Sequence, residues 1–144
     1  MAEFCETTVR VRYAETDQMG VVYHANYLIW FEVGRVELLR SVGIDYKTME
    51  SVDDTFIVVV EASARYSKPA RYDEVIRIRT RIGAATTRMC KVEYEVLNDA
   101  TGELLATGGT THVFCDRNGK PHLLPAKYRA QFGVRESVTQ GAES

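Results

Sequence analysis

The second half of the chain shows a period of two in its apolar residues, which is the pattern of half-buried β-strands. Between residues 75 and 82, Ile76, Ile78 and Ile82 share one side while arginines occupy the other. Residues 88 to 97 alternate in the same way, with charged residues on the polar side. The predicted strands cover Thr7 to Tyr13, Phe56 to Val60, Ala62 to Tyr66, Val75 to Ile82, Arg88 to Leu97 and Leu104 to Cys115.

Residues Asn26 to Val42 repeat their apolar residues three and four apart, which predicts an α-helix. Asn26 is a favoured N-cap residue, and Gly43 suits the left-handed position just past the helix end. Further apolar residues widen the stripe so far that we expect other parts of the fold to wrap the helix. The stripe consists of Leu28, Phe31, Leu38, Leu39 and Val42, and Tyr27, Ile29, Trp30, Val33 and Val36 widen it.

Each alternating strand has one apolar face to bury, and the long helix is the natural partner for these faces. The pattern therefore predicts an α+β fold in which a curved antiparallel sheet of about five strands wraps around one helix. Turns are expected at Pro69 with Tyr72-Asp73, at residues 98–102 and at 116–119, and a short helix from Pro125 to Phe132. We expect one domain over residues 1–136 and a disordered tail over 137–144.

The chain has 144 residues and a net charge of -2, which suits one globular domain and argues against a nucleic-acid-binding surface. Cys5, Cys90 and Cys115 are widely spaced and odd in number, which indicates reduced thiols in a cytoplasmic protein rather than a zinc site. No apolar run approaches the ~20 residues that cross a membrane, and the N-terminus lacks the pattern of a signal peptide.

Candidate chemistry is concentrated between Tyr13 and Tyr27, just before the helix. This segment contains a carboxylate (Asp17), a glycine turn (Gly20) and an imidazole (His24). A carboxylate and a histidine beside the amide-rich start of a helix can attack an acyl carbonyl and stabilise the oxyanion that forms. The segment is therefore the candidate active site.

The motif Tyr13-x-Glu-Thr-Asp17-x-x-Gly20-Val-Val-Tyr23-His24-Ala-Asn26-Tyr27 resembles the hotdog-fold acyl-CoA thioesterases. The chain specifically resembles the 4-hydroxybenzoyl-CoA thioesterase-like family and its Tol-Pal-associated branch. Two further segments support this resemblance: Phe31-Glu32 and Tyr66-x-x-Pro69-Ala-Arg-Tyr-Asp73. The resemblance implies a homodimer or homotetramer with active sites at the interface, and acyl-CoA hydrolysis without a metal or organic cofactor. It places the catalytic aspartate at Asp17 and the branch's histidine at His24.

Two roles for Asp17 stay open: attack on the thioester as a nucleophile, or activation of a water molecule as a general base. A plain turn-capping aspartate is the structural alternative. His24 would assist by proton transfer, or serve only as a structural hydrogen-bonding group. The backbone amides from His24 through Tyr27 are the expected oxyanion site, with Tyr23 and Asn26 shaping the pocket.

For the coenzyme A phosphates we expect Arg88, with Lys68 and Arg71 as weaker candidates. The turn before Arg88 reads Ala84-Ala-Thr-Thr, with fewer charges than in the 4-hydroxybenzoyl-specific enzyme, which weakens the case for that substrate. The arginines at 77, 79 and 81 are expected to pair across strands with Glu93 and Glu95 instead. Glu32 is a minor catalytic candidate on the helix.

Two other function classes compete with hydrolysis. A non-catalytic acyl-CoA-binding hotdog protein, acting as a sensor or partner-binding module, is the main alternative. A hotdog hydratase or dehydratase is disfavoured, because Asp17 before Gly20 does not match its motif. His112 and His122 are interpreted as ordinary strand and loop residues.

Overall fold

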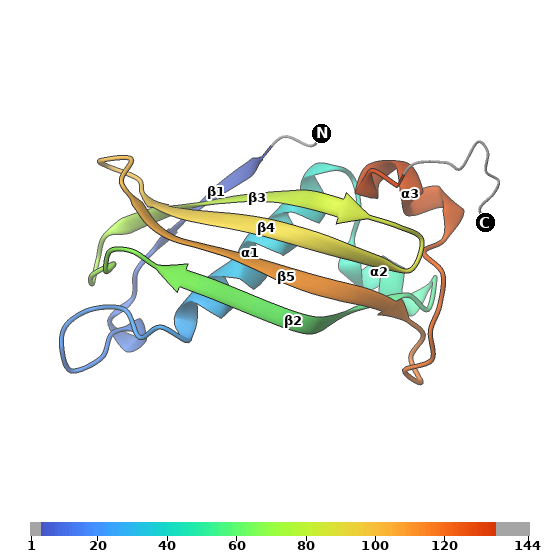
Figure 1. Cartoon of the computed structure of the whole chain (residues 1–144), viewed down its shortest axis with the longest axis horizontal. Helices are drawn as coiled ribbons and strands as arrows, with labels where there is room; N and C mark the ends of the chain where they lie inside the picture. Colours follow the sequence, from blue (N-terminus) through green and yellow to red (C-terminus); the bar gives the residue numbers. More distant parts are fainter. Residues whose placement is uncertain (1–3, 135–144) are drawn as a thin grey trace.

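The computed structural model describes residues 4–134, so the tail expected at 137–144 lies outside the described residues. Five antiparallel strands form one sheet in the order β1-β3-β4-β5-β2, and α1 crosses one face of it (Figure 1). The strands are β1 (Cys5–Arg10), β2 (Phe56–Tyr66), β3 (Val75–Ala85), β4 (Met89–Asn98) and β5 (Leu104–Cys115). The helices are α1 (Asn26–Ser41), α2 (Tyr46–Ser51) and α3 (Ala126–Phe132).

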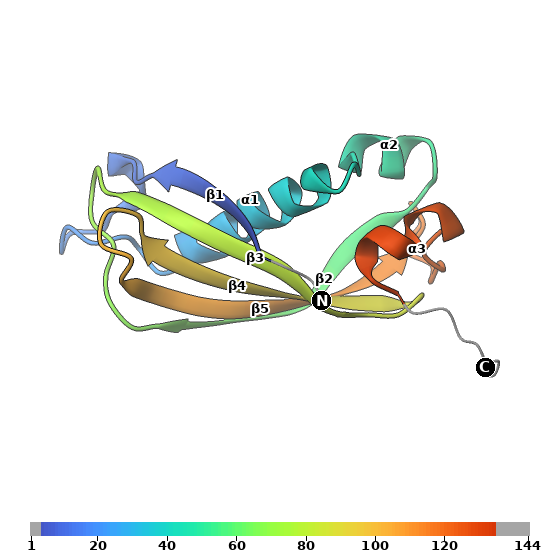
Figure 2. The ribbon, with the colours of Figure 1, turned by 90° about the horizontal axis from the view of Figure 1, so that it is seen from above.

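The sheet curves toward α1, which lies on its concave side (Figure 2). Phe31 of α1 stacks on Tyr94 of β4 with ring centroids 4.3 Å apart, and both rings are buried. Gly34 permits the close approach of helix and sheet, since a Cβ there would lie 2.3 Å from Thr80 Oγ1. The predicted α+β arrangement of a curved five-stranded sheet around one long helix is confirmed.

The alternation in β3 and β4 separates an apolar face from a charged face, as predicted. The apolar residues at the concave face, including Ile76, Ile78, Val92 and Val96, are buried. On the convex face the arginines meet carboxylates of neighbouring segments. The ion pairs join Arg77 to Asp99, Arg79 to Glu6 and Glu95, and Arg81 to Glu93. The convex face is therefore a network of cross-strand ion pairs within one chain.

Several expected boundaries were wrong. The first strand ends at Arg10, because the chain turns into a 3-10 helix over Tyr13–Glu15 in which the Glu15 carboxylate accepts from Arg12 N at 2.8 Å. Residues 56–60 and 62–66 form the single strand β2, with a bulge between Val59 and Glu61. The helix α2 was not predicted; Asp45 caps it by accepting from Lys47 N at 3.4 Å, and the same carboxylate also accepts from Thr48 Oγ1 at 2.9 Å.

The start and the outer face of α1 also differ from expectation. Ala25, not Asn26, occupies the N-cap position, and Asn26 begins the helix. The sheet covers one side of α1 only, so Leu28 and Ile29 remain 44% and 52% exposed. One chain therefore does not wrap its helix, and an apolar surface is left over. No helix in the described part of the chain is long and apolar enough to span a membrane.

Candidate active site

Asp17 lies in a tight loop that joins the 3-10 turn to α1. The loop is closed by a hydrogen bond from Asp17 N to Val21 O at 2.8 Å, and Gly20 adopts a φ of +80° at its corner. Oδ1 of Asp17 accepts from Met19 N at 2.8 Å, so the carboxylate does cap its own turn. Oδ2 accepts no hydrogen bond from the described residues, and the side chain is exposed. The second oxygen is therefore accessible to a substrate.

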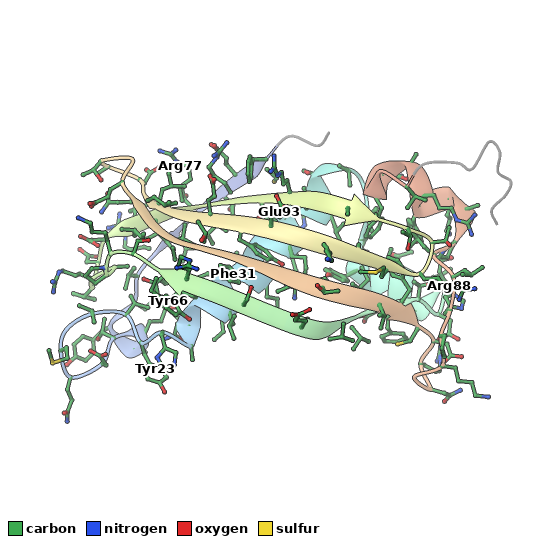
Figure 3. All side chains as sticks on the ribbon, in the orientation of Figure 1. Tyr23, Phe31, Tyr66, Arg77, Arg88 and Glu93 are labelled. Atoms are coloured by element: carbon green, nitrogen blue, oxygen red, sulfur yellow. The ribbon has the colours of Figure 1, made fainter. Side chains whose placement is uncertain are left out.

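His24 stands in a groove of about 330 Å³ between the start of α1 and the end of β2. Its ring lies against Tyr23 and Tyr66, with centroids 4.6 Å and 6.1 Å away, and Tyr66 Oη donates to His24 O at 3.2 Å. Tyr23 and Tyr66 lie at the same end of the molecule in Figure 3. The groove is lined by Val22, His24, Tyr27, Tyr66, Ser67, Lys68 and Pro69.

The amides at the start of α1 divide into two groups. Asn26 N donates to Tyr23 O at 2.9 Å and Tyr27 N to His24 O at 3.1 Å, so these two amides are already occupied. The amides of His24 and Ala25 donate no hydrogen bond to any described residue. The oxyanion site expected over four amides is therefore reduced to two, both beside the imidazole and at the positive end of the helix dipole.

The remaining predicted residues are distributed unevenly around this groove. Tyr27 forms its wall but is buried, and burial raises the pKa of its hydroxyl. Lys68 lines the groove and pairs with Glu103 at 3.1 Å. Asn26 faces the other way, with Nδ2 donating to Glu15 O at 2.9 Å. Asp17 is not among the residues that line the groove.

Arg88 lies at the opposite end of the sheet from Tyr23 and Tyr66 (Figure 3). The strand register agrees, since Met89 pairs with Val113 whereas Val96 and Tyr66 both pair with Ala106. Seven residues along a strand correspond to about 24 Å. Arg88 is exposed and makes no ion pair with the described residues. It lines a separate hollow of about 240 Å³ with Val113, Phe114, Cys115, Gly119, Pro121 and His122.

Sequence reasoning missed three features. Tyr66 belongs to the groove, and its place in the Tyr66-x-x-Pro69 motif was the available signal. Glu15 is a buried carboxylate with the spacing of a capping box, but Arg12 stands where the capping-box signature has Ser or Thr, so the sequence carried no recognisable signal. His112, interpreted as an ordinary strand residue, is fully buried, and burial together with the charge of Arg35 lowers its pKa to about 4.

Two other predictions concern side chains away from the groove. Glu32 is exposed and does not line the groove. The three cysteines are free, with Cys90 and Cys115 buried. Burial raises the pKa of the Cys90 thiol to about 12, so it is inert as a nucleophile. Within residues 4–134 no group of three or more His, Cys, Asp or Glu side chains is placed to hold a metal ion.

Comparison with known proteins adds independent evidence. A family model described as "Thioesterase-like superfamily" matches residues 11–132. The putative acyl-CoA thioesterase YneP of Bacillus subtilis is 39% identical over 124 residues, covering 86% of both chains. Acyl-CoA thioesterase YbgC of Haemophilus influenzae is 30% identical over 126 residues, covering 86% of this chain and 90% of that protein. The crystal structure of DHNA-CoA thioesterase from Staphylococcus aureus has a TM-score of 0.85 at 30% identity, covering 90% and 89% of the two chains. These similarities confirm the hotdog fold.

Proposed function

Because the chain belongs to the thioesterase-like superfamily, we propose that it hydrolyses the thioester bond of an acyl-CoA to a free acid and coenzyme A. One observation carries the proposal most directly: the unpartnered amides of His24 and Ala25 lie at a helix start, beside an imidazole and an open groove. A protein that only binds acyl-CoA has no need for donors directed at the carbonyl oxygen. A hydrolase does, because that oxygen gains charge during the reaction.

The thioester oxygen accepts from these two amides in the proposed complex. In the transition state this oxygen carries negative charge, which the amides and the helix dipole stabilise without having to reorganise. Removal of one such donor typically costs ~3–4 kcal/mol of transition-state stabilisation. The hydrogen bond from Tyr66 Oη to His24 O holds this part of the backbone against the end of β2.

Asp17 supplies the carboxylate in either of two ways. As a nucleophile, Oδ2 bonds to the acyl carbon, the carbon–sulfur bond breaks, and coenzyme A leaves as a thiolate that takes up a proton. Water then opens the mixed anhydride, releases the acid and restores the carboxylate. As a general base, Asp17 takes a proton from the water that attacks the acyl carbon directly. In both versions His24 donates the proton to the leaving sulfur.

A second copy of the chain completes the site in this proposal. β2 is an outermost strand of eleven residues with an unpaired edge, so two copies can join by antiparallel pairing of their β2 strands about a two-fold axis. Such pairing sets the Phe56 end of one strand beside the Tyr66 end of the other. Arg88 lies at the Phe56 end, so Arg88 of a second copy approaches the groove that holds His24.

The binding roles follow from this arrangement. Arg88 of the second copy, together with Lys68, binds the phosphates of coenzyme A, while Tyr23 and Tyr27 bound the acyl end of the groove. Asn26 contributes indirectly, through its hydrogen bond to Glu15 O. A cytoplasmic location, membership of the Tol-Pal-associated branch and the choice between dimer and tetramer stay predictions from the sequence.

Release of free thiol from a panel of short-chain, long-chain and aromatic acyl-CoAs tests the proposal. We expect turnover by the wild type, a loss of about 100-fold or more in kcat for Asp17→Asn, and a loss of about 10- to 100-fold for His24→Ala. A wild type that binds an acyl-CoA tightly but releases no thiol would favour the non-catalytic binding protein. Incorporation of ¹⁸O into Asp17 during a single turnover in labelled water separates the nucleophile from the general base.

A further inference from the structure

Glu15 is the only carboxylate among residues 4–134 that is buried, at 5% exposure. It lies two residues before Asp17, at the base of the loop that carries the candidate nucleophile. We propose that the Glu15 carboxylate is a positioning residue, which fixes the Asp17 loop against the start of α1. The proposal rests on the hydrolase function above, and it adds a residue that needs no contact with the substrate.

Three donors converge on the Glu15 carboxylate. Oε1 accepts from Arg12 N at 2.8 Å, and Oε2 accepts from Trp30 Nε1 at 3.3 Å and from Arg12 Nη2 at 3.3 Å. The Arg12 side chain is exposed, so its ion pair contributes little. Trp30 is buried in the core, so its indole N–H has no access to water, and Glu15 is its acceptor. The bond to Trp30 is therefore the one that joins the loop to the body of α1.

The backbone of Glu15 adds two further ties to the same region. Its carbonyl oxygen accepts from Tyr23 N at 2.9 Å and from Asn26 Nδ2 at 2.9 Å. Glu15 thus forms hydrogen bonds with residues on both sides of Asp17 in the sequence, namely residues 12, 23, 26 and 30. The loop between them is closed by the bridge of Thr16 with Val22. Glu15 therefore helps to fix the position of Asp17 relative to the His24 and Ala25 amides, alongside the bond from Val22 N to Ala70 O and the bridge of Val21 with Arg71.

The chemistry of the site requires a carboxylate rather than an amide. Arg12 N and Trp30 Nε1 are both donors, and they approach different oxygens of Glu15. A glutamine has a single acceptor oxygen, so its NH₂ group must face one of the two donors. That donor then loses its acceptor, in a buried place if it is Trp30 Nε1 and in a part-buried place if it is Arg12 N, which loosens the loop at its base. Glu15→Gln is accordingly a small change in shape with a specific effect on hydrogen bonding.

A displaced nucleophile affects the chemical step more than binding. A misplacement of about 1 Å at a reacting group can cost on the order of 100-fold in rate. Two groove residues that would hold the acyl-CoA have other partners: Tyr66 Oη donates to His24 O, and Lys68 pairs with Glu103. We therefore expect Glu15→Gln to lower kcat by about 10- to 100-fold while KM changes by less than about threefold.

The matched control is Glu93→Gln, the same substitution in an exposed ion pair with Arg81 on the convex face, which should leave kcat unchanged. Trp30→Phe removes one donor and keeps the carboxylate, so it should lower kcat less than Glu15→Gln does. In the double variant the Phe substitution should cost less than it does alone, because the bond is already lost. Additive losses in this cycle, or an unchanged kcat in Glu15→Gln, overturn the proposal.

A structural readout keeps this test separate from the test of hydrolysis. Trp30 is the only tryptophan of the chain, so its indole N–H gives one assignable NMR signal. In Glu15→Gln we expect that signal to shift and residues 16–22 to exchange amide hydrogen faster, with no such change in Glu93→Gln. If the wild type hydrolyses no acyl-CoA, the proposed function fails, and these signals alone decide whether Glu15 holds the loop. Unchanged exchange over residues 16–22 would refute the positioning role.

Discussion

The two edge strands of the sheet differ in length and chemistry. β1 has six residues, and its exposed charges are engaged within the chain: Glu6 pairs with Arg79 at 3.0 Å and Arg10 with Asp73 at 3.4 Å. β2 has eleven residues, and three consecutive valines, Val58, Val59 and Val60, are 40%, 45% and 56% exposed. α1 packs mainly over β1 and β3, which leaves the β2 side of the concave face less covered.

This difference supports the β2 edge as the place where a second copy joins in the proposed dimer. A short edge strand with charged residues resists pairing with another chain, whereas a long apolar edge favours it. Leu28 and Ile29 of α1 are exposed apolar residues as well. The His24 groove lies at the end of β2, so an interface along β2 would also border the site. The β1 edge has no comparable relation to the groove.

The largest expected effect is that of a charge on the open edge. Val60→Lys places an ammonium group in the interface proposed for β2, and we expect the oligomer to dissociate and kcat/KM to fall by about 100-fold. Thr8→Lys, at an exposed position of β1, should keep the mass and activity of the wild type. Light scattering coupled to size exclusion measures the mass. A Val60→Lys protein that remains an active oligomer contradicts the assignment of β2.

Mixing two inactive variants tests whether the site combines residues of two copies. Asp17→Asn and Arg88→Glu damage residues near opposite ends of the sheet. If Asp17 of one copy works with Arg88 of another, a 1:1 mixture of dissociated and reassociated chains should recover about a quarter of wild-type activity. The recovery arises because half of the dimers are mixed and each has one intact site. Assayed below KM, no recovery would mean that Arg88 serves its own chain, whereas an Arg88→Glu protein that is active by itself would mean that Arg88 has no role.

Local patterns in the sequence predicted what depends on local chemistry. Ile76 and Val92 alternate with charged residues, so their strands and buried faces follow directly from the sequence. The end of β1 could not be predicted in this way, because a bond between the Glu15 carboxylate and Arg12 N turns the chain early. Asn26 looked like an N-cap for a related reason: its type suits that position, but its amide is used to hold Glu15 O.

The candidate site was only partly predictable because its residues are far apart in the sequence. Tyr66 meets the His24 backbone across 42 positions, and the strand order that brings them together is not visible in either segment. The distance from His24 to Arg88 is likewise a consequence of topology, since both lie in turns at opposite sheet ends. Family resemblance pointed to Asp17 and His24, whereas in the proposed dimer their spatial relation to Arg88 comes from the second copy.

Acid should weaken the β2 side of the sheet before the β1 side. His112 lies on β5, the strand that pairs with β2. Burial lowers the pKa of its imidazole to about 4. In the unfolded chain a histidine titrates near ~6.5, so between pH 6.5 and 4 the unfolded state binds more protons. Stability is therefore full above pH 6.5 and falls by up to about 3 kcal/mol as the pH drops to 4.

His112→Gln, which cannot titrate in this range, should show a flatter dependence of the unfolding free energy on pH. Urea denaturation between pH 7.5 and 4.5 measures the slope. Hydrogen exchange at pH 5 should rise first in β5 and β2, while β1 and β3 stay protected. Equal slopes for wild type and His112→Gln would show that another group controls the acid response.

The smallest expected effect is on the convex face, where the charged residues already satisfy one another. Arg81→Gln breaks the ion pair with Glu93, in which Arg81 Nε lies 2.7 Å from Glu93 Oε1 and both side chains are half-exposed. Exposed ion pairs of this kind contribute roughly 0–1 kcal/mol to the free energy of unfolding, so the midpoint of thermal denaturation should fall by only a few degrees. The oligomer mass and kcat should not change, because the proposed interface runs along β2. If Arg81→Gln alters the mass, the convex face is also an interface, and the contrast between the two edges no longer explains the assembly by itself.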